Sequence, residues 1–149
     1  MTEMSHSGFQ AACDALSGKV DAEQFERFRW TRDELPKLVR LVELVRGSVE
    51  ARTDVEINEE GGTAEAKRFV IKVHGKRIAG LGVALDRGRA VVSIGPVERS
   101  PFPVAAGSPI HAPFEEVDEA WIGETLGTLM ERIGPAAGSS ADTGVRAPG

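Results

Sequence analysis

The sequence has only one cysteine and three histidines, which limits the kinds of site that it can form. A single thiol, Cys13, cannot make an intramolecular disulfide and leaves no cysteine cluster for a metal. His6, His74 and His111 are far apart, and none has a second ligand at the spacing of a metal site. No cofactor or metal is therefore expected. Because Cys13 lies within an apolar helical pattern, we predict that it is buried as a small hydrophobic side chain.

Long apolar runs are also missing. No stretch approaches the roughly 20 apolar residues of a membrane span, and residues 1–7 lack the apolar run of a signal peptide. We therefore expect a cytoplasmic protein that has no membrane partner. The formal net charge of −5 disfavours nucleic acid, because the chain as a whole would repel a phosphate backbone. Frequent alanine, glycine, valine and arginine with little lysine are typical of a GC-rich bacterial genome.

No fingerprint of a catalytic or nucleotide-binding family is present. The glycines of Gly80-Leu81-Gly82 lie in the middle of a predicted strand with no helix after them, so they do not fit a phosphate-binding loop. There is no internal repeat, and no heptad pattern is long enough to predict a coiled coil. An enzyme is therefore not favoured.

Length and composition predict one domain and a tail. The 149 residues are in the usual range for a single domain, and 41% of them are hydrophobic. We predict one α+β domain over residues 1–133. Residues 134–149 are rich in glycine, alanine, serine and proline and cannot repay the entropy of ordering, so we expect a disordered tail.

Helical spacing of apolar residues predicts three helices in the first third of the chain. The first is short and ends before Gly18, and Asp21 begins the second as part of a capping box. The third begins at Thr31 or Asp33 and runs to about Val49. Its apolar side chains form one stripe, so this helix should face the core.

The apolar period then changes from about 3.6 to 2, which indicates strands. We expect a four-stranded antiparallel meander over residues 51–58, 68–74, 78–85 and 90–94, with turns at 59–63, at Gly75 and at 86–89. Pairing Val73 with Ala79, and Val83 with Val92, places every large apolar residue on one face.

A long proline-rich loop and one more helix follow the sheet. The loop covers residues 98–113, and the helix runs from about Glu115 to Ile133. This helix should cover the same face of the sheet as the third helix. Its acidic start, which includes Glu115 and Glu116, suits the positive end of a helix better than an acid–base site. The predicted fold is thus an α+β sheet with helices packed mainly on one face.

The other face of the sheet carries the main functional hypothesis. On the third and fourth strands it presents small or apolar side chains where a solvated face would carry polar ones. Glycines in strands often mark the close approach of another backbone or a ligand. We therefore predict an interaction module, such as an adaptor, chaperone or regulator, that binds a protein partner or a second copy of itself. Its predicted interface, which we call the strip, consists of Gly80, Gly82, Ala84, Val91 and Ser93, with Arg68 and Lys72 at the border.

Two other hypotheses remain open. A small enzyme or ligand-binding domain would have a pocket under residues 101–114, with His111 and Glu115 or Glu116 as polar groups. The structural alternative for the strip is that the N-terminal helices or this loop cover it.

The third hypothesis is nucleic-acid binding through a local basic patch, which lacks outward aromatic side chains for stacking. The residues of this patch are Lys67, Arg68, Lys72, Lys76, Arg77, Arg87 and Arg89.

Overall fold

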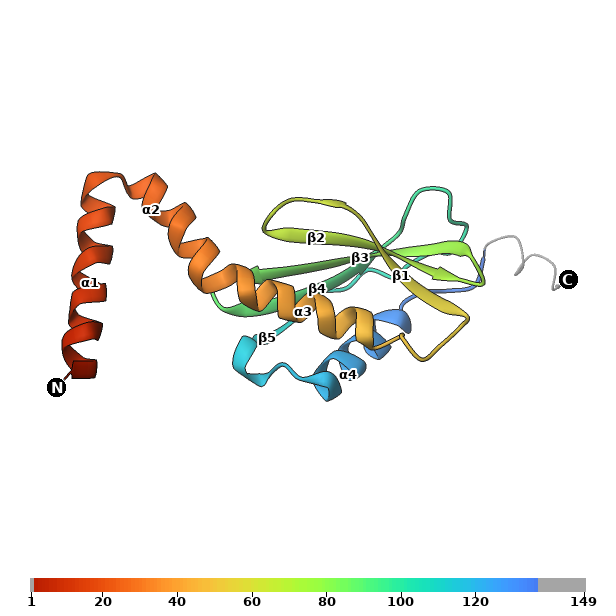
Figure 1. Ribbon diagram of the computed structural model, residues 1–149. Coiled ribbons are helices and arrows are strands. Elements are labelled where there is room, and N and C mark those ends of the chain that lie inside the picture. Colours follow the sequence, from red (N-terminus) through yellow and green to blue (C-terminus); the bar gives the residue numbers. More distant parts are fainter. Residues whose placement is uncertain (1, 137–149) are drawn as a thin grey trace, which may run out of the picture. The chain divides into compact units, whose positions relative to one another are not determined.

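The computed structural model describes residues 2–136, with side chains from residue 7 onward (Figure 1). The chain divides into two compact units, Met1–Pro36 and Lys37–Gly149. The single domain predicted over residues 1–133 spans the first unit and most of the second. Most of the predicted tail, residues 137–149, lies outside the described residues.

The first unit is helical. Helix α1 spans Thr2–Val20 and α2 spans Ala22–Arg29, followed by one π-helical turn, η1, at Trp30–Glu34. The N-cap half of the predicted capping box is confirmed, because the Asp21 carboxylate accepts a hydrogen bond from the Gln24 backbone N–H at 3.1 Å. The other half is not formed, since the Asp21 N–H donates to the Ser17 carbonyl at 3.0 Å. The predicted end before Gly18 is wrong. A glycine within a helix costs about 1 kcal/mol but does not by itself stop the helix.

Side-chain contacts within this unit join α1 to α2 and η1. The Arg32 guanidinium donates to both carboxylate oxygens of Asp14 at 3.0 and 3.2 Å and lies 5.1 Å from the centroid of the Phe28 ring. A Cβ added to Gly18 would lie 3.8 Å from the Phe25 ring. Cys13 is exposed, so its predicted burial is wrong. The apolar side of α1 that contains it has no cover within the unit.

The predicted cap of the third helix at Thr31 or Asp33 is also wrong, because both residues lie inside η1. The Thr31 hydroxyl donates back to the Arg27 carbonyl at 3.0 Å and caps nothing. The π-helical turn ends two residues before Pro36, which has no N–H to continue an α-helical ladder. Helix α3 spans Leu35–Gly47 and ends two residues before the predicted Val49.

The second unit contains a five-stranded antiparallel sheet in the order β1-β2-β3-β4-β5, one strand more than predicted. The α+β class and the antiparallel meander are as expected. The additional strand, β5, comes from the end of the predicted proline-rich loop, where His111 pairs with Val91 and Ala112 pairs with Ala90. Four residues that end in proline are too short for a pattern of alternation. The strands are β1 Val55–Gly62, β2 Ala66–Val73, β3 Lys76–Asp86, β4 Arg89–Gly95 and β5 Ile110–Pro113.

Strand β1 begins and ends about four residues later than predicted. Turns with backbone hydrogen bonds occupy the segment after α3, including one from the Arg52 N–H to the Val49 carbonyl at 3.0 Å. The strand then continues through Gly61 and Gly62, whose φ angles of 82° and 105° suit glycine alone. The first reversal therefore lies at residues 63–65, and the predicted turn over 59–63 is wrong.

In the β2–β3 pair, the turn and the core require different registers. His74 and Gly75 both have positive φ, and this two-residue turn pairs Val73 with Lys76. Continued without interruption, that register would turn the apolar side chains of β3 away from those of β2. A bulge at Ile78 restores the match, so that Ile71, not Val73, lies opposite Ala79. The predicted pair Val83–Val92 is confirmed.

Helices α3 and α4 lie on the same side of the sheet, as predicted (Figure 1). Helix α4 spans Glu119–Met130, and its N-cap is Asp118, which accepts from the Trp121 N–H at 2.8 Å. It therefore begins later than predicted, and the preceding 3-10 turn η2, Phe114–Glu116, contains both glutamates of the alternative pocket. No helix in residues 2–136 is long and apolar enough to span a membrane.

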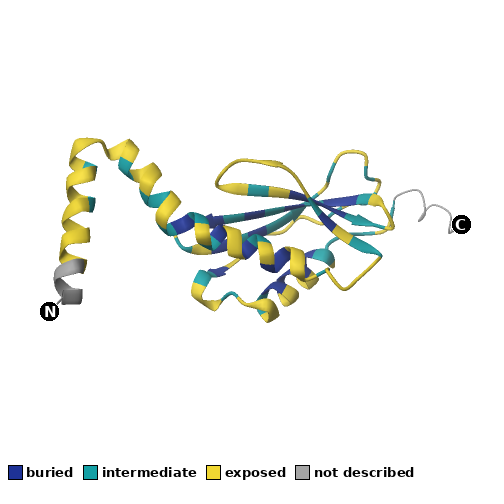
Figure 2. Ribbon diagram, viewed as in Figure 1, coloured by how far each residue is buried: buried dark blue, intermediate teal, exposed yellow. Residues whose placement is uncertain are grey.

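The core lies between this helical layer and the facing side of the sheet (Figure 2). The Arg46 guanidinium of α3 stacks 5.9 Å from the centroid of the Phe69 ring, which ties the helix to β2. The largest side chains with less than 2% exposure are Leu38, Leu41, Val45, Phe69, Ile71, Leu81, Val83, Val92, Ile122 and Leu129. Because this face is closed by the unit's own helices, a binding surface on the sheet has to use the other face.

Candidate functional site

The second face of the sheet brings most of the strip together. Antiparallel pairing places Arg68, Gly82 and Ser93 in one row across β2, β3 and β4. Ala84 and Val91 are paired in the neighbouring row toward the β3–β4 turn. All of the strip is partly exposed, so residues 37–136 leave this surface open to a ligand or partner. Lys72 lies farther along β2 and pairs with Arg77.

This face is hollowed into a groove of about 990 Å³. Strands β2, β3 and β4 make its floor, the β1–β2 hairpin makes one wall, and the chain after β4 makes the other. Six of the seven residues predicted for the interface line it, and Lys72 is the exception. The lining includes Glu60, Gly62, Arg68, Val70, Arg77, Gly80, Gly82, Ala84, Val91, Ser93, Gly95, Val97 and Glu98.

Hydrogen bonds tie both walls to the sheet. The Arg77 guanidinium donates to both carboxylate oxygens of Glu60 at 2.9 Å and to the Glu98 carbonyl at 3.3 Å, so one side chain bridges hairpin and loop. The Ser100 hydroxyl donates to the Ile78 carbonyl at 2.7 Å and anchors the loop to β3. Thr63 closes the hairpin by accepting from the Ala66 N–H at 3.1 Å. The groove is therefore held open by ordered contacts within the second unit.

Small residues keep the floor of the groove low. A Cβ added to Gly80 would meet the Gly95 carbonyl at 3.7 Å, an ordinary contact, and one added to Gly95 would meet nothing within 4 Å. At Gly82 the new Cβ would lie 2.7 Å from the Ser93 Oγ. The space above Gly95 is thus free, whereas that above Gly82 is shared with the neighbouring strand. An approaching segment can reach the backbone of the floor at both places.

Charge at the groove is modest. Glu60 and Arg77 neutralise each other, and the Lys67 ammonium lies 3.8 Å from Glu59. Arg68 is exposed and makes no hydrogen bond or ion pair with any described residue, so its guanidinium is available to a partner. This single cation at the rim would favour a carboxylate on the bound segment.

The walls were missed by the sequence analysis. Position 62 requires glycine because its φ is 105° and because a Cβ there would lie 2.5 Å from the Ala66 carbonyl oxygen. Gly95 and Pro96 lie between the fourth predicted strand, which ends at residue 94, and the predicted loop over residues 98–113, and no role was predicted for them. At Gly62 and at Gly95 the chain leaves the plane of the sheet to form a wall of the groove. A glycine at such a point is the sequence signal that could have predicted the walls.

The three residues predicted for the alternative pocket lie on two different elements, β5 and η2. His111 lies exposed on β5, where its Nδ1 is 2.8 Å from an Arg89 guanidinium nitrogen. Glu115 and Glu116 are exposed on η2, and the Glu115 carboxylate lies 4.0 Å from the Lys37 ammonium of α3. None of the three lines the groove. The pocket under residues 101–114 stays a prediction.

The basic patch is divided among several places on the second unit. Lys67 and Arg77 are paired with glutamates, Lys76 lies beside the β2–β3 turn, and Arg87 forms the β3–β4 turn. Successive turns of a meander lie at opposite ends of the sheet, so these last two cations are far apart. A continuous phosphate-binding stripe is not favoured by this placement.

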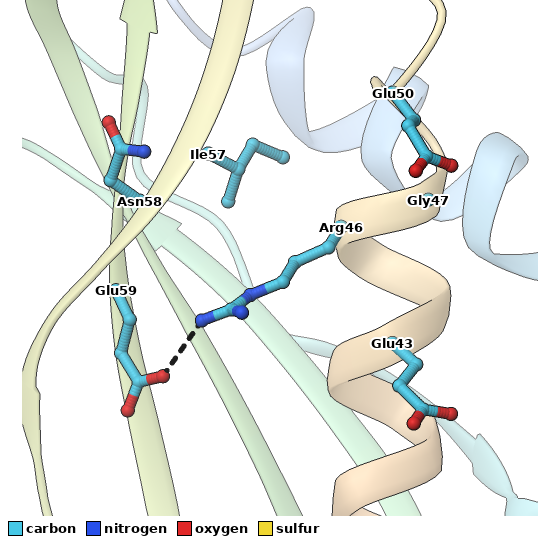
Figure 3. A pocket seen from close by; sticks show the side chains of 7 residues that line it. All are labelled: Glu43, Arg46, Gly47, Glu50, Ile57, Asn58 and Glu59. Atoms are coloured by element: carbon cyan, nitrogen blue, oxygen red, sulfur yellow. Dashed lines mark hydrogen bonds and ion pairs between the residues drawn. The ribbon is translucent and has the colours of Figure 1, made fainter.

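A second hollow of about 500 Å³ lies between α3 and β1 (Figure 3). The Arg46 side chain crosses it and donates to the Glu59 carboxylate at 3.1 Å, while Glu43 and Glu50 lie on its helical side. The one cation is thus already paired across the opening. No group of three or more histidine, cysteine or acidic side chains among the described residues could hold a metal ion.

Comparisons of the chain with protein-family models, with curated proteins and with solved structures found no match.

Proposed function

We propose that this chain is a protein-interaction module, of the adaptor, chaperone or regulator type, whose groove receives a segment of a partner protein. The observation that carries the proposal is the open, small-residue floor between two walls that are hydrogen-bonded in place. An exposed surface of this kind is typical of an interface rather than of a solvated sheet face.

The shape of the groove favours a polypeptide segment over a buried small molecule. Its floor extends along β3 from Gly80 to Ala84, which is roughly 13 Å at the rise of an extended strand. The lining offers few convergent polar groups, since Glu60 and Arg77 are used on each other. Side chains of a bound segment would pack on the glycines, and an acidic one would pair with Arg68.

A substitution that fills the groove without disturbing the fold tests the proposal. In Gly95→Gln the new side chain starts from an open position and extends into the groove. Gly123→Gln is the matched control, because Gly123 is exposed on α4 and also meets nothing within 4 Å. The full-length chain and both variants would be used as baits in lysate of the cells that make the protein, with quantitative mass spectrometry of the bound proteins.

The expected result is a specific set of proteins that the wild type and Gly123→Gln retain equally and that Gly95→Gln loses by about tenfold or more, as expected for an interaction worth at least 1.4 kcal/mol. Equal retention of every captured protein by all three baits would contradict the proposal. Circular dichroism and urea denaturation would confirm that each variant is folded.

A further inference from the structure

Helix α1 carries a row of exposed apolar side chains that its own unit does not cover. Phe9, Leu16 and Val20 are 64%, 62% and 77% exposed, and Cys13 between them is exposed as well. Figure 2 shows α1 exposed along most of its length. We call these four residues the seam. Large side chains at this exposure are costly in water, and a contiguous row of them marks an interaction surface.

The seam points away from the only described contact surface of α1. Asp14, bound to Arg32, and Gly18, next to Phe25, lie on the side that faces α2 and η1. At 3.6 residues per turn, Leu16 lies roughly 160° around the helix from both of them. The helical hairpin of the first unit is therefore complete without the seam.

The spacing within the seam is that of a coiled coil. Phe9, Cys13, Leu16 and Val20 are separated by four, three and four residues, the d-a-d-a spacing of two heptads. The predicted helix ended before Gly18 and could not include this pattern, whereas α1 continues to Val20. In parallel coiled coils, leucine at a d position and a β-branched residue at an a position favour two strands.

We propose that the seam binds the seam of a second copy of this chain, as a short parallel two-helix coil. The flanking e and g positions, Gln10, Ala12, Ser17 and Lys19, include one charge, so two copies meet without opposed like charges. Asp14 and Gly18 occupy b and f positions, and the α1–α2 hairpin is compatible with the pair. This surface is separate from the groove, and the proposal does not depend on the proposed function.

The size of the seam sets the expected affinity. A contact of four side chains from each copy is small compared with the at least about 1,000 Å² that a specific, stable interface buries. We therefore expect a reversible dimer with a dissociation constant on the order of 10–100 µM, rather than an obligate one. Sedimentation velocity over a concentration series of the full-length chain would measure it.

Cys13 offers a direct readout of the geometry because it is the only cysteine in the sequence. In a parallel pair the two a-position thiols face each other across the axis, so a short bismaleimide should link two chains in high yield. The matched control is Cys13→Ala/Ala15→Cys, which moves the thiol to an exposed position off the seam. This variant should cross-link at least about tenfold less if the a positions alone face each other.

A charge on the seam should break the dimer. Leu16→Asp should weaken association by at least about tenfold, whereas Ala15→Asp adds the same charge off the seam and should change it less than about twofold. A monomer at all concentrations, or equal cross-linking from both cysteine positions, would overturn the proposal. So would a monomer in which Cys13 is protected from maleimide, because the seam would then be covered by its own chain.

Discussion

The floor of the groove makes a quantitative prediction about the row that joins Gly82 to Ser93. The two residues are register partners on β3 and β4, and a Cβ at Gly82 would lie 2.7 Å from the Ser93 Oγ. That distance is too short for any real Cβ contact, so Gly82→Ala forces the serine hydroxyl to move. Ser93→Ala removes the hydroxyl and leaves the rest of the side chain in place.

The two substitutions should therefore not be additive. Replacing glycine by alanine within a strand stabilises it by about 0.5–1 kcal/mol, since glycine loses more conformational freedom on folding. Displacing Ser93 from its rotamer costs about 0.5–1.5 kcal/mol. In the wild-type background these terms roughly cancel, so Gly82→Ala should be nearly neutral. In the Ser93→Ala background only the gain remains, which gives a coupling energy of about 1 kcal/mol.

Urea denaturation of the wild type, both single variants and the double variant would measure this coupling. The signal should report on the sheet, for example through far-ultraviolet circular dichroism near the strand minimum. A coupling within about 0.3–0.5 kcal/mol of zero is the scatter expected for independent sites. That result would refute the contact between Gly82 and Ser93 and with it the low, shared floor of the groove.

Other local features of the second unit make separate predictions. Arg87 has a φ of 51°, so Arg87→Asn should stabilise the β3–β4 turn by about 0.5–1 kcal/mol in thermal denaturation. Asp118→Ala should cost about 1 kcal/mol by removing the N-cap of α4, measured in urea. Hydrogen bonding to Arg52 lowers the pKa of Asp54 to about 2, and Arg52→Ala should raise that pKa toward its ordinary value in an NMR titration.

Each of these predictions has a sign that can be checked. Gly88 has a φ of 80° beside Arg87, so Gly88→Ala should destabilise the same turn by at least about 1 kcal/mol. Because the folded-state pKa of Asp54 lies below the unfolded value, the ion pair stabilises the fold above about pH 4. Its contribution is lost as the pH falls toward about 2. An unchanged Asp54 titration in Arg52→Ala would contradict the assigned cause.

Much of the core could be predicted from local pattern. Alternation in β2, β3 and β4 placed Phe69, Leu81 and Val92 on one face, and all three are buried there. The β2–β3 and β3–β4 reversals fall where glycine follows a polar residue, as a two-residue turn requires. These features depend on a few neighbouring residues, so the linear sequence contains the information that decides them.

The structure differs from the sequence predictions where segments that are distant in the sequence contact each other. Strand β5 exists because β4 offers an unpaired edge to residues 110–113, which have no strand pattern of their own. The bulge at Ile78 reconciles a turn that sets one register with a core that needs another. The alternation of β2 places Val70 on the groove side, opposite to Phe69 and Ile71, yet its side chain is only 3% exposed. Local periodicity cannot report such contacts.

The sequence by itself determined that the second face of the sheet is small and uncharged at Gly80, Gly82 and Ala84, because side-chain size and strand period are local properties. Only the tertiary structure decided that this face is a groove. Its walls come from the β1–β2 hairpin and from the chain after Gly95, and Arg77 holds them together through Glu60 and the Glu98 backbone. Those contacts join residues about 20 positions apart, so they exist only once the sheet has formed.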